Sequence, residues 1–145
     1  MLFKNEEVSL KLDIVNYEFP ADGGDPTSDD RNWLVLRATW VNDEGQIVKD
    51  SNSCLLTYEL REMTAGLKVL GAGVKDWYAS SFVEPYFELA AQAEGDQFRV
   101  DVSFYLPNTM DGDDTAEVTA CMSKAELGEL IDELDKLCAK YPDRA

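Results

Sequence analysis

The sequence contains no histidine and few positively charged residues. The absence of imidazole excludes histidine general bases, serine–histidine and cysteine–histidine catalytic pairs, and histidine-ligated metal sites. Lysine and arginine together number 13 against 29 aspartate and glutamate residues, a formal net charge of −16 at pH 7. A surface of this charge repels phosphate groups, so we expect no direct binding to nucleic acid or to an anionic membrane.

Cysteine is also scarce, and its spacing favours neither a disulfide framework nor a zinc site. Cys54, Cys121 and Cys138 form an odd set without a CxxC pair. We expect all three to be reduced core residues. A reactive Cys54 is the sharper alternative, because it lies just before a predicted helix N-terminus, where a thiolate is stabilised.

Long apolar runs are absent as well. The N-terminus turns acidic at Glu6 and Glu7 without an apolar stretch, so we expect no signal peptide, no transmembrane span and a cytoplasmic location. Hydrophobic residues make up 45% of the chain and aromatic residues 10%, too many for a disordered protein. The length of 145 residues suits one folded domain, which we place over residues 1–145.

Alternating apolar and polar residues predict antiparallel strands. The alternation over residues 8–14 changes parity at Val15, which predicts a β-bulge there. Residues 32–41 are apolar on both parities, which is typical of a central strand covered on both faces. Residues 42–45 then form a hairpin turn into a strand over residues 46–49.

Further strands are predicted in the second half of the chain. Residues 87–93 and 98–106 alternate most regularly, and the short turn between them predicts a hairpin. Residues 118–122 suggest a last short strand. The loops over residues 21–31 and 108–114 are rich in aspartate and are expected to be exposed.

Two helices complete the prediction. The first begins at Thr57, carries apolar residues at spacings of three and four, and ends at Gly71, although Gly66 weakens it. The second begins at a capping box formed by Ser123 and Glu126. Its apolar stripe makes it clearly amphipathic. We therefore predict an α+β fold with a mainly antiparallel β-sheet and two packed helices, of which the C-terminal one is amphipathic.

Two acids lie among apolar residues and are the candidates for carboxylate catalysis. Glu59 falls in the first turn of a predicted helix, where the helix dipole favours a carboxylate, so we expect a structural role. Glu84 is the better candidate for a buried catalytic acid, although a buried structural hydrogen bond explains it more simply. The aspartate-rich loops fit no calcium-loop pattern, and we predict no metal, no cofactor and no enzyme activity.

The remaining feature is the charge itself, which is typical either of a surface that binds a protein partner or of one that only keeps the protein soluble. A strongly negative field attracts a basic protein partner and imitates the phosphates of that partner's substrate. Trp77 and Tyr78, beside a predicted turn, are either core residues or partly exposed binding anchors. The predicted partner-binding residues are Asp22, Asp25, Asp29, Asp30, Asp111, Asp113, Asp114, Trp77 and Tyr78.

Several short islands of sequence support this interpretation. They are Tyr17-Glu18-Phe19-Pro20, Asn32-Trp33-Leu34, Cys54-Leu55-Leu56-Thr57-Tyr58-Glu59-Leu60, Phe82-Val83-Glu84-Pro85 and Phe87-Glu88-Leu89. In order and spacing, together with the C-terminal helix, they resemble the WapI-type immunity proteins, which are small acidic proteins of the bacterial cytosol. The resemblance implies protection of the producer cell by binding the toxic C-terminal domain of a wall-associated protein, which in the family's namesake is a ribonuclease acting on tRNA.

The leading hypothesis is therefore a non-enzymatic immunity protein that binds and neutralises a basic toxin domain, such as a nuclease, through its acidic face. The alternative is a non-catalytic scaffold module of another partner, including a homodimer joined through exposed aromatic residues or a sheet edge. A third reading is an enzyme that uses Glu84 as its acid.

Overall fold

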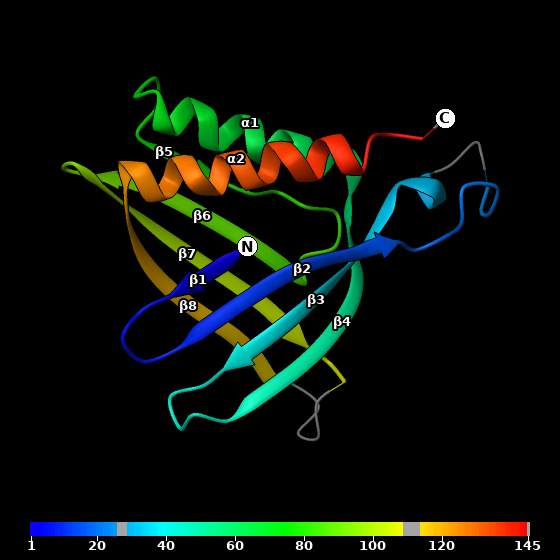
Figure 1. The fold of residues 1–145 in the computed structure, drawn as a ribbon, viewed down its shortest axis with the longest axis horizontal. Helices are drawn as coiled ribbons and strands as arrows, with labels where there is room; N and C mark the ends of the chain where they lie inside the picture. Colours follow the sequence, from blue (N-terminus) through cyan, green and yellow to red (C-terminus); the bar gives the residue numbers. More distant parts are fainter. Residues whose placement is uncertain (26–28, 109–113, 145) are drawn as a thin grey trace.

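The computed structural model describes residues 1–25, 29–108 and 114–144. Within these residues the strands form two antiparallel sheets, and two helices lie side by side along one end of both sheets (Figure 1). The first sheet has the order β1-β2-β3-β4, with β1 (Leu2–Lys4), β2 (Ser9–Tyr17), β3 (Trp33–Val41) and β4 (Ile47–Leu56). The second sheet has the order β5-β6-β7-β8, with β5 (Trp77–Ala79), β6 (Phe87–Glu94), β7 (Gln97–Leu106) and β8 (Asp114–Ser123).

The helices are α1 (Thr57–Gly71) and α2 (Lys124–Lys140), and a short 3₁₀ helix spans Asp29–Asn32. These bounds confirm both predicted helices. The capping box of α2 is present, since the Ser123 hydroxyl accepts from the backbone N–H of Glu126 at 3.1 Å and the Glu126 carboxylate accepts from that of Ser123 at 3.1 Å. The α+β class is likewise confirmed, with two separate sheets where the sequence suggested one.

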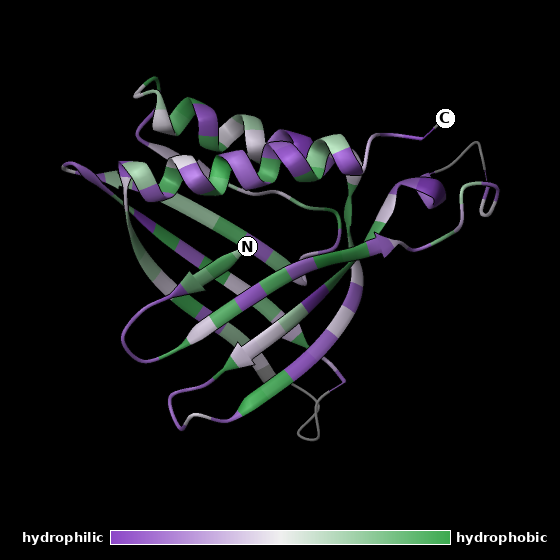
Figure 2. Ribbon diagram, in the orientation of Figure 1, coloured by the Kyte–Doolittle hydropathy of each residue, from purple (hydrophilic) through white to green (hydrophobic). Residues whose placement is uncertain are grey.

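One hydrophobic core lies between the inner faces of the two sheets and the apolar stripes of the helices. Along β6, β7 and β8 every second residue is buried, and Figure 2 shows the matching alternation of hydrophobic and hydrophilic residues. The helices add Leu60, Met63, Leu67, Leu127 and Leu134, each at most 1% exposed. Burial of such side chains stabilises a fold by roughly 1.5–3 kcal/mol each.

Two polar contacts join the first sheet to the second, one from the turn between β1 and β2 and one from β4. The side-chain amide of Asn5 donates to the carbonyl oxygen of Thr119 on β8 at 3.1 Å. Asp50 of β4 is buried and accepts from the backbone N–H and the side-chain amide of Asn108, at 2.9 and 2.8 Å, just beyond the end of β7. The sequence did not single out Asp50, because its position in a polar stretch of β4 gives no sign of burial.

The predicted bulge and hairpins are confirmed. The register of β2 against β3 shifts between Ile14 and Asn16. The β6–β7 hairpin pairs Glu94 with Gln97, and Gly95 at its tip has φ +63°, a conformation that favours glycine.

Several expectations about strands and cysteines are wrong in part. β3 is covered on one face only: Leu34 and Leu36 are buried, whereas Trp33 and Val35 on the other face are half-buried. β4 and β8 are longer than the sequence predicts. The sequence does not predict β1 and β5, because three residues are too few to show a period. Of the cysteines, only Cys54 is fully buried; Cys138 is half-buried, and Cys121 is exposed.

Candidate protein-binding surface

The second sheet presents a face directed away from the core, and a wide groove of about 810 Å³ lies against it. We call this face the outer face; its residues alternate with the buried ones along β6, β7 and β8. The sheet residues that line the groove are mostly small or acidic, namely Glu88, Ala90, Asp101, Ser103, Thr115, Glu117 and Thr119. Small side chains leave the surface hollow, and the acidic ones give it charge.

Strand register brings the three sheet carboxylates into neighbouring rows. In one row Ser103 of β7 is paired with Glu88 of β6 on one side and with Glu117 of β8 on the other. Strands lie about 4.8 Å apart, so the two glutamates stand about 10 Å from each other across Ser103. In the next row Asp101 is paired with Ala90 and Thr119, two residues along the strand and roughly 7 Å away.

The partners of these carboxylates differ. Asp101 accepts from the Thr119 hydroxyl at 2.6 Å, and its other oxygen forms an ion pair with Arg99 at 3.2 Å. These contacts hold Asp101 in place and offset part of its charge. Glu88 and Glu117 are exposed.

A turn and the end of β3 form the other side of the groove. Asn5 fixes the turn, because its side-chain oxygen accepts from the backbone N–H groups of Glu7 and Val8 at 2.8 and 3.0 Å. Glu7 and Val8 line the groove, as do Trp40 and Asp43. Among the described residues that line the groove, every charged side chain is acidic: Glu7, Asp43, Glu88, Asp101 and Glu117.

The two predicted aromatic anchors have different surroundings. Trp77 is 62% exposed on edge strand β5. It is paired with Gln92 of β6. The adjacent row of paired residues on the same face contains Ala79, Ala90 and Asp101. The Trp77 side chain therefore shares the outer face with the groove. Tyr78 points to the opposite side and is half-buried, with its ring so close to Gly66 that an added Cβ would lie 2.3 Å from it. Gly66, which looked like a weakness of the first helix, makes room for this ring.

The predicted acidic loop lies elsewhere on the molecule. Figure 1 shows residues 21–25 and the 3₁₀ helix at one end of the view, far from β5. Asp22, Asp25 and Asp29 are exposed and Asp30 is half-buried. Asp30 accepts from the backbone N–H of Asp25 at 3.1 Å, and Asp29 accepts from the Tyr58 hydroxyl at 3.5 Å.

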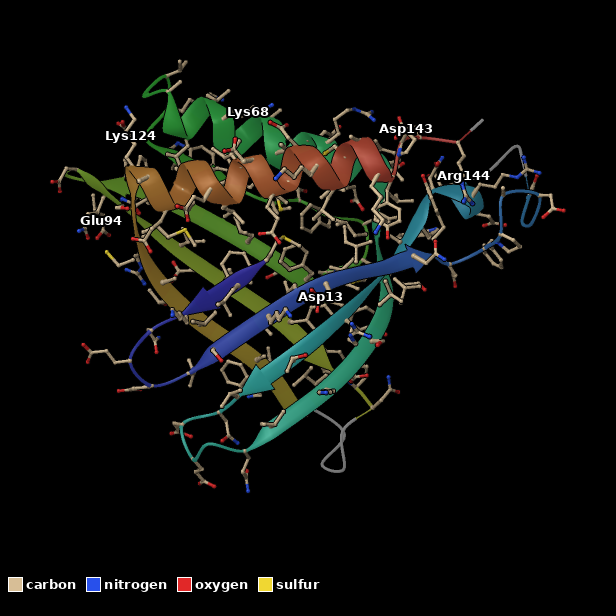
Figure 3. All side chains as sticks on the ribbon, in the orientation of Figure 1. Asp13, Lys68, Glu94, Lys124, Asp143 and Arg144 are labelled. Atoms are coloured by element: carbon tan, nitrogen blue, oxygen red, sulfur yellow. The ribbon has the colours of Figure 1, made fainter. Side chains whose placement is uncertain are left out.

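Arg144 holds both ends of this acidic loop. Its guanidinium donates to the carbonyl oxygen of Phe19 at 3.0 Å and lies 3.4 Å from the centre of the Tyr17 ring. Its backbone N–H donates to the side chain of Asn32 at 2.7 Å, while the Asn32 amide donates back to the Arg144 carbonyl at 3.2 Å. Figure 3 shows Arg144 and the neighbouring Asp143 at the same end of the molecule as this loop.

The second predicted acidic loop gives less information. Asp111 and Asp113 lie outside the described residues, and Asp114 is the first residue of β8. The acidic loop and the 3₁₀ helix that follows it are called the 21–32 loop, of which residues 26–28 lie outside the described residues. Within the described residues, the predicted binding positions divide between the 21–32 loop, the start of β8, and β5.

The candidate catalytic acids have structural or exposed positions. Glu59 is buried, and its two carboxylate oxygens accept from the backbone N–H groups of Leu56 at 3.0 Å and Val83 at 2.8 Å. It therefore ties the start of α1 to the loop before β6. Glu84 is exposed, so the expectation of a buried acid there is wrong; the turn before β6 places it at the surface.

Cys54 does not have the environment of a reactive thiolate. Burial, with smaller contributions from the charges of Glu59 and Glu84, raises the pKa of its thiol to about 12. No group of three or more aspartate, glutamate or cysteine side chains suited to a metal ion occurs in the described part of the chain. Nor does any helix described here have the length and apolar character to cross a membrane.

Comparison with known proteins gives one family. Residues 1–142 match the family model described as the immunity protein WapI-like family. No curated protein matches the sequence. Among solved structures, the crystal structure of WHY3 from Arabidopsis thaliana is similar at 15% sequence identity and a TM-score of 0.48, covering 97% of this chain and 86% of that one.

Proposed function

This chain belongs to the immunity protein WapI-like family, and we propose that it binds and neutralises a basic toxin domain in the cytoplasm of the cell that produces both. The observation that carries the proposal is the family match over residues 1–142 in a chain with a net charge of −16. A toxin that acts on nucleic acid presents a basic active-site surface, and an acidic protein covers such a surface in place of the substrate. We therefore propose a nuclease as the class of toxin.

Neutralisation by occlusion needs no catalytic group on this chain. Glu59 is occupied by two backbone N–H groups, and Cys54 is held as a neutral thiol. The contacts that we propose from the sequence stay Asp22, Asp25, Asp29, Asp30, Asp111, Asp113, Asp114, Trp77 and Tyr78. Those that the structure describes lie in the 21–32 loop, at the start of β8 and on β5. The separation of the 21–32 loop from β5 means that a partner reaching both would span the molecule.

The test begins with capture of the partner. The tagged chain is used as bait in a lysate of the source cells at low ionic strength, and bound proteins are released by stepwise salt and identified by mass spectrometry. A basic protein that elutes late is then expressed in a bacterial host, alone and together with this chain. We expect growth arrest from the captured protein alone and restored growth with the chain present.

Two results would contradict the proposal. One is a captured protein that is harmless when expressed alone. The other is a toxic protein whose effect is unchanged by co-expression, since an immunity protein must remove the toxicity and not merely bind. As a control for nonspecific binding to acid, the chain is replaced by an unrelated protein of similar size and negative charge.

A further inference from the structure

We propose that the outer face of the second sheet, from Trp77 across to Glu117, is the docking surface for an extended, arginine- or lysine-rich segment of the protein partner. The proposal rests on the immunity function only for the partner's identity. The surface itself is defined by the groove of about 810 Å³ and by the outer face of the sheet beneath it.

The negative charge of the groove favours a positively charged ligand. Five carboxylates line the groove, and no lysine or arginine occurs among its described lining residues. Arg99 lies nearby on the same face, but its guanidinium is engaged by Asp101 at 3.2 Å. Carboxylates about 10 Å apart repel one another weakly at physiological salt, so they coexist in the free protein and their field favours a cationic ligand.

The spacing of the acids favours an extended segment. The row of Glu88 and Glu117 is separated from the row of Asp101 by two residues along the strand, roughly 7 Å. Alternate residues of an extended chain repeat at the same distance. A segment with basic residues at alternate positions can therefore place successive cations against successive rows of carboxylates.

Two tryptophans contribute to the recognition. Trp77 stands at one corner of the outer face at 62% exposure. Trp40 lines the groove but is half-buried and packs against the core. The faces of tryptophan rings attract guanidinium groups. An exposed indole ring beside the carboxylate rows favours arginine over a simple counterion.

The test uses a defined probe and the three tryptophans of the chain. A capped nine-residue peptide of alternating arginine and threonine is titrated into the ¹⁵N-labelled protein, with a glutamine–threonine peptide as control. We expect the indole N–H signals of Trp40 and Trp77 to shift and that of Trp33, on the outward face of β3, to remain. Shifts confined to the 21–32 loop or to the helices would overturn the proposal.

Matched variants separate a docking site from general acidity. The groove variant combines Glu88→Gln, Asp101→Asn and Glu117→Gln; the control combines Glu62→Gln, Glu129→Gln and Asp132→Asn, which neutralises three exposed acids of the helices. We expect about tenfold weaker peptide binding in the groove variant, from the modest free energy of each exposed charge contact, and less than twofold in the control. Equal losses in the two variants would contradict the proposal.

A blocking variant keeps the test independent of any folding change. Ser103→Arg leaves every carboxylate in place and puts a cation between Glu88 and Glu117, so we expect it to abolish peptide binding with unchanged thermal unfolding. In the growth assay, the triple variant and Ser103→Arg are compared with the wild type. If all three proteins restore growth equally, the groove is refuted and the immunity function stands. Peptide binding at the groove without any protection from a captured toxin would refute the function and leave the groove.

Discussion

Glu59 offers the most direct test of how this fold is held together. Its buried carboxylate accepts two backbone N–H groups, those of Leu56 and Val83, which are 27 residues apart in sequence by their numbering. A hydrogen bond to a charged group contributes roughly 1.5–3 kcal/mol, and a first-turn acid adds about 0.3–1 kcal/mol through the helix dipole. Glu59→Ala removes all of these contacts and leaves two donors without an acceptor.

The expected losses can be ranked. Glu59→Gln keeps one acceptor oxygen but turns an amide N–H₂ toward one of the two N–H groups, so we expect a loss of about 2–3 kcal/mol in the free energy of unfolding. Glu59→Ala loses both bonds and is expected to cost about 4 kcal/mol. Urea unfolding followed by circular dichroism measures both values. The matched control is Glu62→Gln, an exposed acid one turn along α1, for which we expect a change within about 0.5 kcal/mol.

Two results would refute the assignment of this stability to the two hydrogen bonds of the Glu59 carboxylate. If Glu59→Gln is as stable as Glu62→Gln, the charged bonds to Leu56 and Val83 contribute nothing net. If Glu59→Ala and Glu59→Gln are equally destabilised, the remaining acceptor oxygen of glutamine has no role.

Three further predictions concern the helix–sheet packing and the cysteines. Gly66→Ala places a Cβ within 2.4 Å of two atoms of the Tyr78 ring, so we expect a net loss of about 1 kcal/mol in the free energy of unfolding by urea, despite the better helix propensity of alanine. In a Tyr78→Ala background the same change should instead stabilise the protein. A loss of equal size in that background would contradict the packing explanation. For the cysteines, we expect a thiol reagent at pH 8 to label exposed Cys121 rapidly and Cys54 only after unfolding, as mass spectrometry of the labelled protein can show; rapid labelling of Cys54 in the native state would be inconsistent with its burial. Burial raises the pKa of Cys54 in the folded protein from 9.0 to about 12, so its protonated state contributes stability that is present below pH 9 and lost as pH rises toward 12. Cys54→Ala should therefore reduce the slope of the free energy of unfolding against pH in that range.

The helices and most strands could be predicted because their signals are local. The apolar stripe that begins after Thr57 and the capping box at Ser123 act within one or two turns, and both helices begin at those positions. The β6–β7 hairpin follows from regular alternation around a two-residue turn at Gly95. The sequence does not predict the short strands β1 and β5, because three residues are too few to show an alternation of apolar and polar side chains.

Burial of polar residues could not be predicted in the same way. Glu84 and Glu59 both lie among apolar neighbours in sequence, yet Glu84 is exposed and Glu59 is buried. The difference comes from the loop before β6, which returns to the start of α1 and offers Glu59 the N–H of Val83. Asp50 is buried for a similar reason, by its contact with Asn108 from the other sheet.

The sequence by itself determined the strong negative charge, the alternation that gives each strand one apolar face, and the starts of both helices, because each depends on composition or on residues close in the chain. Only the tertiary structure decided which acids act together. Glu88, Asp101 and Glu117 lie on three strands and share one face through the register of β6, β7 and β8, to which Trp77 is added by the pairing of β5. Register is set by contacts between residues far apart in sequence, so no local pattern could have brought these four side chains together.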